Sequence, residues 1–485
     1  MNRFATSFDA WLFAALVALV ALAPLPLGSN RPLPAALIAL AAGILLLFWA
    51  IGAATNRLPN ATAGLVRRLR IPLTLYLLVI LWVLIQWLPA PFASWGNPIW
   101  LEASTALERA LAPRITINPG ATLAALANLL AYGAVFWLAF QLTIDPDRAR
   151  QARNALMAIG GAYALYGFFV WFGGMGWIDD RLASSDRRSF SSTFVNRNSF
   201  ATFAGLTLLC TVTICFERIR HILSIARPLR QRAALMIETM VFHSGWVTAA
   251  MLATAIALLL TASRGGILAT AAALVALIAL QLKPGNAQAR HRGVIVMLFL
   301  VAAGTVLVVA GNDFIERIDQ RGLTIESDLR QTIFTTTIEA IRSAPWIGTG
   351  YGTYPDAIEA WRANDPDIFM LWEKAHSTWL ENALELGLPA AAALHLSVFW
   401  LALIAFRGVS ERRRHRAFPA LGVAATLLVG LHALVDFSLQ IPAVAILYAF
   451  IMGIAVAQSL PQRSRKDHKP TEEQTSSISP YGPAG

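Results

Sequence analysis

Residues 34–54 read PAALIALAAGILLLFWAIGAA, a run of 21 residues without a charged side chain. As a helix, a run of this length spans about 30 Å, which is the thickness of the hydrocarbon core of a typical bilayer. The run therefore predicts a helix that crosses a membrane.

Similar runs recur along the 485-residue chain, 56% of which is hydrophobic and only 14% charged, unlike a soluble globular protein. The sequence predicts an all-α polytopic membrane protein with about twelve transmembrane helices. Only Arg3 precedes the first run, so we interpret that run as a span and not as a cleavable signal peptide. The twelve runs lie at about 9–26, 34–54, 71–89, 121–142, 154–174, 198–216, 241–261, 265–282, 293–311, 386–406, 417–435 and 441–459.

The Lys and Arg side chains are unevenly distributed between the connections. If the N-terminus is cytoplasmic, 25 of the 39 lie in cytoplasmic connections, as the positive-inside rule requires. We therefore predict that both termini are cytoplasmic. The net charge of +11 then serves orientation beside anionic membrane lipids, and no nucleic-acid partner is expected.

The predicted spans divide the chain into four parts. Residues 1–311 hold transmembrane helices 1–9, with outer loops at 90–120 and 175–197. Residues 312–385 form a helical outer segment with 13 acidic and six basic side chains. Residues 386–460 hold helices 10–12, and residues 461–485 form a disordered cytoplasmic tail.

Helix start and stop signals subdivide the outer segment. We expect helices at about 327–343 and 354–362, separated by the breaker sequence APWIGTGYGTYP. A third helix is expected through KAHSTWLENALELG, residues 374–387, and should run into the tenth span.

The outer loop RRSFSSTFVNRNSF, residues 187–200, carries three arginines and no acid on the side where positive charge is scarce. Arg188, Arg197, Asn198 and the start of the sixth span supply hydrogen-bond donors and partial positive charge. This set suits an anion, with phosphate or pyrophosphate the natural choice at a membrane surface. The alternative is that the arginines pair with nearby aspartates or with lipid headgroups.

Two further motifs place ionisable residues on the outer side. Arg264, in TASRGGILAT (261–270), lies in a short turn beside two glycines that allow close approach of a helix or ligand. His376 is expected on a helical face with Trp379, where a side chain that titrates near neutral pH suits a general base. The alternatives are an arginine that snorkels from a turn and a structural histidine.

His432 and Asp436, in HALVDFSLQIP (432–442), are one helical turn apart, and structural pairing is the favoured interpretation. Cys210 and Cys215 point to different helix faces, which predicts neither a disulfide nor a metal pair. Because the chain has no Gly-rich nucleotide loop and no His or Cys beside its carboxylate runs, no cofactor or metal is indicated.

Five motifs follow one another in order: RRSFSSTFVNRNSFATFAGL, SRGG, AIRSAPWIGTGYGTYP, AHSTWLENALELG and HALVDFSLQIPA. In this order they resemble the O-antigen ligase / O-antigen polymerase superfamily of bacterial integral membrane glycosyltransferases, over roughly residues 155–455. One departure is visible, because Ser192 stands where a glycine usually precedes Thr-Phe.

The resemblance implies a GT-C-like fold in the bacterial inner membrane, with a periplasmic helical segment over the site. Members take a glycan from undecaprenyl pyrophosphate without a metal. Ligases pass it to a lipid A–core sugar, and polymerases pass it to another lipid-linked repeat. Matched by position, Arg188, Arg197 and Arg264 correspond to arginines around the pyrophosphate, and His376 to the catalytic histidine.

We therefore expect an O-antigen-ligase-like glycosyltransferase of surface polysaccharide biosynthesis, with a periplasmic active site and membrane lipids around it. His376 and Arg264 are the predicted catalytic residues, and Asn198 joins the pyrophosphate-binding arginines. Arg342 and Asp436 are predicted to support the site. A polymerase of the same superfamily is the first alternative. The second is a small-anion transporter, although transporters place ionisable residues near the bilayer midplane rather than at one surface.

Overall fold

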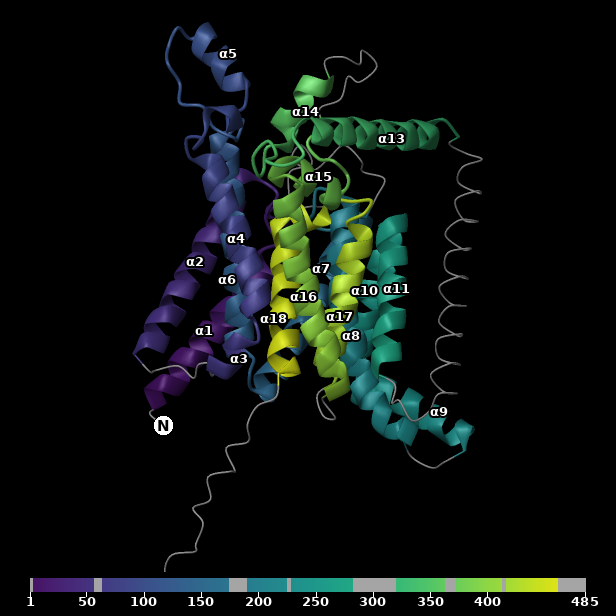
Figure 1. Cartoon of the computed structure of the whole chain (residues 1–485). Coiled ribbons are helices and arrows are strands. Elements are labelled where there is room, and N and C mark those ends of the chain that lie inside the picture. The colour runs from purple at the N-terminus through teal and green to yellow at the C-terminus, as the bar shows by residue number, and fades with distance from the viewer. Residues whose placement is uncertain are drawn as a thin grey trace, which may run out of the picture.

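The computed structural model describes residues 3–55, 63–173, 190–224, 228–281, 320–362, 372–411 and 416–460, which form a bundle of helices (Figure 1). Eight of the described helices are long and apolar enough to cross a membrane, which confirms the predicted all-helical membrane fold. They are α2 (Pro32–Ala54), α4 (Arg70–Trp87), α6 (Pro119–Leu142), α7 (Pro146–Gly173), α8 (Arg197–Ser224, apolar to Ile219), α11 (Arg264–Gln281), α16 (Leu388–Glu411) and α18 (Pro442–Ser459).

Three more predicted spans are present as helices of other kinds. Helices α1 (Arg3–Leu22) and α17 (Ala417–His432) are apolar over shorter lengths. Helices α9 (Leu229–Glu238) and α10 (Gly245–Leu260) form a pair bent by 86°, which would make a ninth span if counted as one. The run at 293–311 lies outside the described residues, so the number of about twelve stays a prediction.

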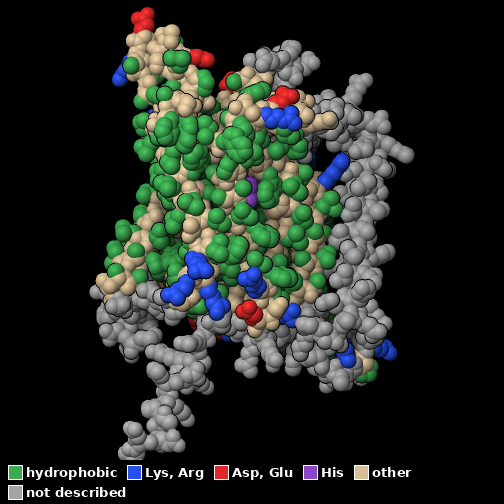
Figure 2. All heavy atoms as spheres, viewed as in Figure 1, with side chains coloured by type: hydrophobic (Ala, Val, Ile, Leu, Met, Phe, Trp, Pro, Cys, Tyr) green, Lys and Arg blue, Asp and Glu red, His purple; other side chains and the backbone are tan. Residues whose placement is uncertain are grey.

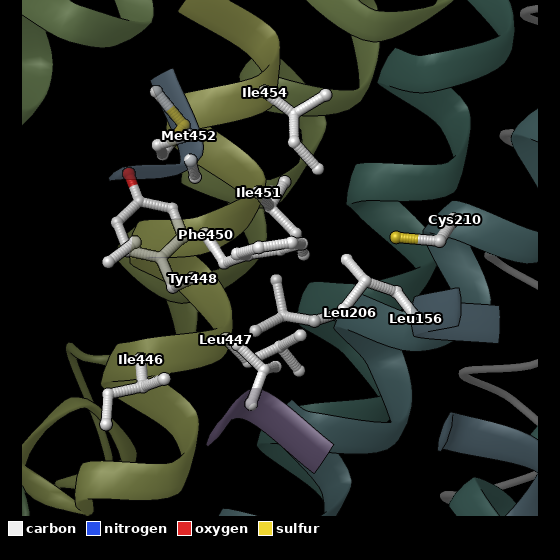
Figure 3. Packing of buried hydrophobic residues seen from close by; sticks show 14 of the residues in the cluster. Leu156, Leu206, Cys210, Ile446, Leu447, Tyr448, Phe450, Ile451, Met452 and Ile454 are labelled. Atoms are coloured by element: carbon white, nitrogen blue, oxygen red, sulfur yellow. The ribbon is translucent and has the colours of Figure 1, made fainter. Parts of the chain in front are cut away.

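Helix α18 is buried over its whole length and packs against α6, α16 and α17. Figure 3 shows its side chains, among them Leu447 and Phe450, beside Leu206 and Cys210 of α8. A Cβ atom at Gly453 would lie 2.5 Å from the Cβ of Ala139 in α6, so the glycine allows these two helices to pack closely. Both cysteines of the chain are buried free thiols.

The two ends of the bundle differ. We call the end where α1 begins and α18 ends the lower end, and the opposite end the upper end (Figure 1). Figure 2 shows a band of hydrophobic side chains with Lys and Arg gathered at its lower edge. A short helix, α3 (Ala63–Arg67), lies at the lower end, and α5 (Ile99–Ala106), from the predicted loop at 90–120, lies beyond the upper end.

Three helices of the predicted outer segment lie at the upper end: α13 (Gln320–Ser343), α14 (Tyr354–Arg362) and α15 (Thr378–Leu386) (Figure 1). The prediction for 354–362 is confirmed, whereas α13 begins earlier than expected. The prediction of one helix through 374–387 into the tenth span is wrong. Helix α15 begins only at Thr378, and Gly387 separates it from α16 with a φ of 77°, a conformation that favours glycine.

Hydrogen bonds from α4 hold this segment against the bundle. The Nε2 of Gln86, a fully buried side chain, donates to the carbonyls of Ile347 at 2.9 Å and Glu385 at 2.8 Å. The indole nitrogen of Trp82 donates to the carbonyl of Leu386 at 2.8 Å. These bonds satisfy carbonyls at the end of α15 and fix its position over the transmembrane helices.

Candidate functional site

Aromatic side chains anchor the described part of the loop before α8. Phe190, Phe194, Phe200 and Phe203 are buried and pack ring against ring, with adjacent centroids 5.4–6.4 Å apart. Their burial stabilises the chain segment that leads into the first turn of α8.

The start of α8 is capped by a side chain of the preceding loop. The Asn196 side chain accepts a hydrogen bond from the backbone N–H of Asn198 at 2.7 Å, so it caps the helix that begins at Arg197. The Arg197 side chain is half-buried at this helix start. Arg188, the other loop arginine predicted to bind pyrophosphate, lies outside the described residues.

Ser192 adopts a left-handed backbone conformation, with a φ of 53°. This conformation explains why a glycine suits the position, because a side chain there is strained by about 1–2 kcal/mol. The Ser192 hydroxyl offsets the strain by donating a hydrogen bond to the carbonyl of Tyr163 in α7 at 2.8 Å.

Two substitutions at Ser192 should separate strain from hydrogen bonding. Ser192→Ala keeps the strain and removes the hydrogen bond, so we expect it to lower the free energy of unfolding by about 1 kcal/mol. Ser192→Gly removes both, and its stability should stay within about 0.5 kcal/mol of the wild type. Thermal unfolding of the purified variants in detergent measures the difference, and equal losses of stability in both variants would contradict this explanation.

The turn before α11 holds Arg264 at the upper end of the bundle. The buried Ser263 hydroxyl accepts a hydrogen bond from the N–H of Gly266 at 3.3 Å and so caps the helix. Arg264 is the first residue of α11, and its side chain is exposed. A Cβ at Gly265 would lie 3.0 Å from the His432 ring of α17, and one at Gly266 would lie 2.7 Å from Ala201 of α8. The predicted close approach is therefore made by two neighbouring helices.

His432 and Asp436 each contact α8. His432 Nδ1 lies 2.7 Å from the Thr202 hydroxyl, and Asp436 Oδ1 accepts a hydrogen bond from Asn198 Nδ2 at 3.1 Å. Both side chains are almost completely buried, and the Ser438 hydroxyl donates to the second carboxylate oxygen of Asp436. The connection between α17 and α18, residues 433–441, is thereby fixed to the helix that begins with Arg197. We call it the α17–α18 loop.

His376 lies just before α15 and not within it. Ser377 caps the helix by accepting from the Leu380 N–H at 3.5 Å, so His376 is outside the helix with a φ of 53°. The predicted helical face shared with Trp379 is therefore wrong. The His376 ring meets the Phe437 ring of the α17–α18 loop edge to face, with centroids 5.2 Å apart.

The same loop holds the start of α15. The backbone N–H and the hydroxyl of Thr378 donate to the carbonyl of Asp436 at 3.2 and 3.1 Å. One short loop thus contacts the segment that carries His376 and, through the Asp436 side chain, the first turn of α8. With Gly265 against His432, the starts of α8, α11 and α15 meet around the end of α17.

Two buried carboxylates fix the backbone around His376. Glu381 is 1% exposed and accepts hydrogen bonds from the Ala375 N–H and from Lys374 Nζ, both at 3.0 Å. Glu385 is equally buried and accepts from the N–H of Tyr354 at 2.9 Å, which joins α15 to α14. Glu381 therefore holds the residue directly before His376.

Residues 249–395 match the family model described as O-antigen ligase. The chain contains an O-antigen ligase domain. This match confirms the predicted superfamily and includes Arg264, Arg342 and His376. A search of the curated proteins found no match.

Two elements outside the matched range complete the surroundings of the O-antigen ligase domain. The first turn of α8 carries Arg197 and Asn198, and the α17–α18 loop carries Asp436. The hydrogen bonds of Asn198 and Thr378 to Asp436 tie both elements to the domain. Arg342 does not join this network, because it is an exposed residue in the last turn of α13.

Several contacts of the O-antigen ligase domain were missed from the sequence. Thr202, Thr378 and Ser438 are small hydroxyl residues with no local pattern that marks them, and their partners are distant in sequence. The burial of Glu381 and Glu385 could have been recognised, because both acids lie next to leucines on the apolar face of a short amphipathic helix. Among the described residues, no group of three or more His, Cys, Asp or Glu side chains is arranged to hold a metal ion.

The buried Glu385 makes the stability of the domain depend on pH. Burial, reinforced by the neighbouring Glu381 carboxylate, raises the pKa of Glu385 from 4.5 to about 8. Between these values the folded protein holds a proton that the unfolded chain releases, so stability falls as the pH rises from about 4.5 to 8.

Glu385→Gln should remove this dependence, because the amide oxygen still accepts from the Tyr354 N–H but the side chain no longer titrates. We expect similar melting temperatures for wild type and variant near pH 4.5, and a more stable variant at pH 8.5. Melting curves across this range provide the measurement. A difference between the two proteins that stays constant with pH would contradict the raised pKa.

Proposed function

We propose that the protein is an O-antigen-ligase-type glycosyltransferase that moves a glycan from undecaprenyl pyrophosphate to an acceptor sugar hydroxyl. The observation that carries the proposal is the O-antigen ligase domain in which Arg264 and His376 both lie at the upper end of the bundle, around the α17–α18 loop. A family that acts on lipid-linked glycans suits a site at the edge of a membrane.

The distribution of charge supports an orientation for this site. Lys and Arg gather at the lower edge of the hydrophobic band, which the positive-inside rule assigns to the cytoplasm (Figure 2). We propose that the upper end, with α13 to α15, faces the periplasm of a bacterial inner membrane. The outer loops and the outer segment predicted from the sequence then lie on the periplasmic side, and the predicted C-terminal tail lies in the cytoplasm. Both termini are then cytoplasmic.

The donor side of the proposed reaction uses positive charge. Arg197 and Arg264 begin α8 and α11, where the helix dipoles add partial positive charge. As the bond between the anomeric carbon and the pyrophosphate breaks, negative charge develops on the leaving oxygen, and fixed cations stabilise it. Asn198, oriented by Asp436, and Arg188 of the preceding loop complete the proposed pyrophosphate site. These side chains supply the charge in the proposed reaction without a metal.

The acceptor side uses His376. A sugar hydroxyl is a weak nucleophile, so a base that takes its proton during attack lowers the barrier. The hydroxyl oxygen forms the new bond to the anomeric carbon while the bond to pyrophosphate breaks, and His376 later releases the proton to water. Such a one-step displacement inverts the configuration of the anomeric carbon.

Two alternatives are kept. A polymerase of the same superfamily would use the same donor and differ only in its acceptor. A small-anion transporter is the second, because transporters often contain broken helices and α9 and α10 form a bent pair. Arg197 and Arg264, however, lie at helix starts at one end of the bundle, which favours chemistry at the membrane surface.

Deletion of the gene tests the proposed function in cells. Loss of a ligase should leave polymerised repeats that are not attached to lipid A–core. Loss of a polymerase should instead leave single repeats on the core, or no long polymer. Electrophoresis of the extracted polysaccharide separates these outcomes, and an unchanged polysaccharide profile in the deletion strain would contradict both enzymatic assignments.

A further inference from the structure

The side chain of Glu381, in the first turn of α15, folds back onto the chain that leads into the helix. Its carboxylate oxygens accept hydrogen bonds from Lys374 Nζ and from the Ala375 N–H, each at 3.0 Å. The Glu381 N–H also donates to the carbonyl of Ser377 at 3.0 Å. Glu381 therefore contacts the residues on both sides of His376, and these hydrogen bonds close a tight loop around it.

The burial of Glu381 is more than a backbone N–H requires. The side chain is 1% exposed, whereas Lys374, its partner in the ion pair, is 29% exposed. Burial lowers the pKa of Lys374, but the Glu381 and Glu385 carboxylates raise it to a value above the usual 10.5, so Lys374 is charged at neutral pH. A buried carboxylate is costly even when it is paired, and a neutral glutamine would also accept from the Ala375 N–H. A costly group where a neutral one would serve is typical of functional sites.

The chain after His376 is attached to a different element. The N–H of Thr378 donates to the carbonyls of Ala433 at 3.0 Å and Asp436 at 3.2 Å, both in the α17–α18 loop. His376 thus lies between one attachment to α15, through Ala375, and one to the α17–α18 loop, through Thr378. Because each attachment fixes the backbone within two residues of His376, together they determine where its imidazole ring points.

Apolar packing holds the same segment independently of Glu381. Trp372 and Ala375 are buried in a hydrophobic cluster with Ile333 of α13 and Ile358 of α14. Loss of the Glu381 side chain should therefore leave the segment in place but allow the peptide before Ala375 to rotate. The expected effect is a change in the direction of the chain at the next residue, and not unfolding.

A general base tolerates little error in its position. It must lie within hydrogen-bond reach of the hydroxyl that it deprotonates, and a displacement of about 1 Å costs on the order of 100-fold in rate. The hydrogen bond from Ala375 to Glu381 lies one residue before His376, the proposed base. Its loss should therefore displace the imidazole ring directly.

We propose that Glu381 is the positioning residue of His376. Its carboxylate, balanced by the Lys374 ammonium, orients the Ala375 peptide so that the His376 ring reaches the acceptor hydroxyl. Glu381 acts through His376 and does not itself touch the substrate. The inference rests on the proposed function, in which His376 is the general base, and deepens it by assigning the group that holds the base.

Glu381→Ala, made with and without His376→Asn, tests the inference. In the wild-type background we expect kcat for glycan transfer to fall about 100-fold, with an unchanged KM for the donor. In the His376→Asn background the same substitution should leave kcat unchanged, because no base remains to be positioned. Initial rates of lipid pyrophosphate release by the purified full-length proteins measure both effects.

Glu385→Ala is the matched control. It removes a carboxylate that is equally buried and one helical turn further along α15, but Glu385 accepts from the Tyr354 N–H of α14 and not from the chain beside His376. We expect its melting temperature to fall as that of Glu381→Ala does, while kcat stays near the wild-type value. A kcat as low as that of Glu381→Ala would mean that loss of any buried carboxylate in α15 disturbs the site, which would overturn the inference.

Glu381→Gln is a second, milder variant if Glu381→Ala does not fold. Its amide oxygen still accepts from the Ala375 N–H, but the hydrogen bond is no longer charge-assisted and the ion pair with Lys374 is lost. We expect kcat to lie about tenfold below that of the wild type, and again to be unchanged by the substitution in the His376→Asn background.

The two backgrounds separate positioning from a general structural role. An equal relative loss of kcat in both would overturn the inference, because Glu381 would then affect the site independently of His376. A wild-type kcat for Glu381→Ala would overturn it as well, and either result leaves the proposed function standing. No transfer by the wild type with any lipid-linked glycan would refute the proposed function itself.

Discussion

Arg264→Ala is expected to lower kcat for glycan transfer by on the order of 10²–10³-fold, with little change in stability. The side chain is exposed at the first position of α11, so its removal leaves no cavity in the core of the bundle. In the proposed reaction, what is lost is a fixed positive charge beside the departing pyrophosphate. Release of lipid pyrophosphate by the purified variant, compared with its melting temperature, measures both quantities.

Two variants control for the effect of Arg264. Arg264→Lys keeps the charge but loses the planar donor pair, so we expect its activity to lie between those of the wild type and Arg264→Ala. Arg407→Ala removes an exposed arginine near the C-terminal end of α16, at the lower end of the bundle. This variant should transfer glycan at the wild-type rate. Full activity of Arg264→Ala would refute the proposed role of this arginine.

His376→Asn is expected to lower kcat by on the order of 10²–10⁴-fold, as loss of a general base does. Asparagine is chosen because it tolerates the left-handed backbone that His376 adopts, so the loop should keep its conformation. The variant should bind the donor as well as the wild type does, because His376 does not contact the pyrophosphate in the proposed reaction. Initial rates at varied donor concentration separate KM from kcat.

His376→Ala serves as the comparison. It should lose as much activity as His376→Asn and also some stability, because alanine is less tolerant of a positive φ than asparagine. If His376→Asn retains the wild-type kcat, histidine is structural at this position. If Asn restores most of the activity that Ala loses, the side chain shapes the loop rather than moving a proton.

The sequence carries enough information for the membrane fold because each span is a local pattern. A run such as 34–54 contains its whole signal, and so does the helix at Tyr354–Arg362. The order of the five motifs also identified the domain. The family match covers three of these motifs in full: SRGG, AIRSAPWIGTGYGTYP and AHSTWLENALELG.

The site could be predicted only in part, because its contacts join distant segments. Asn198 and Asp436 are 238 residues apart, and no local pattern connects them. The spacing of apolar residues predicted that His376 lies within a helix. In the structure the helix begins two residues after His376, because Ser377 caps it and Ala375 is hydrogen-bonded to Glu381.

Transfer in proteoliposomes tests most directly whether Arg264 and His376 act on one lipid-linked glycan. Purified protein is supplied with undecaprenyl-pyrophosphate-linked glycan and acceptor, and both the new glycosidic bond and the released lipid pyrophosphate are measured. We predict one molecule of lipid pyrophosphate for each bond formed by the wild type, and rates of both products lower by about 100-fold or more for Arg264→Ala and His376→Asn. Uptake of a small anion into the same vesicles, with no lipid-linked glycan consumed, would contradict the proposed function.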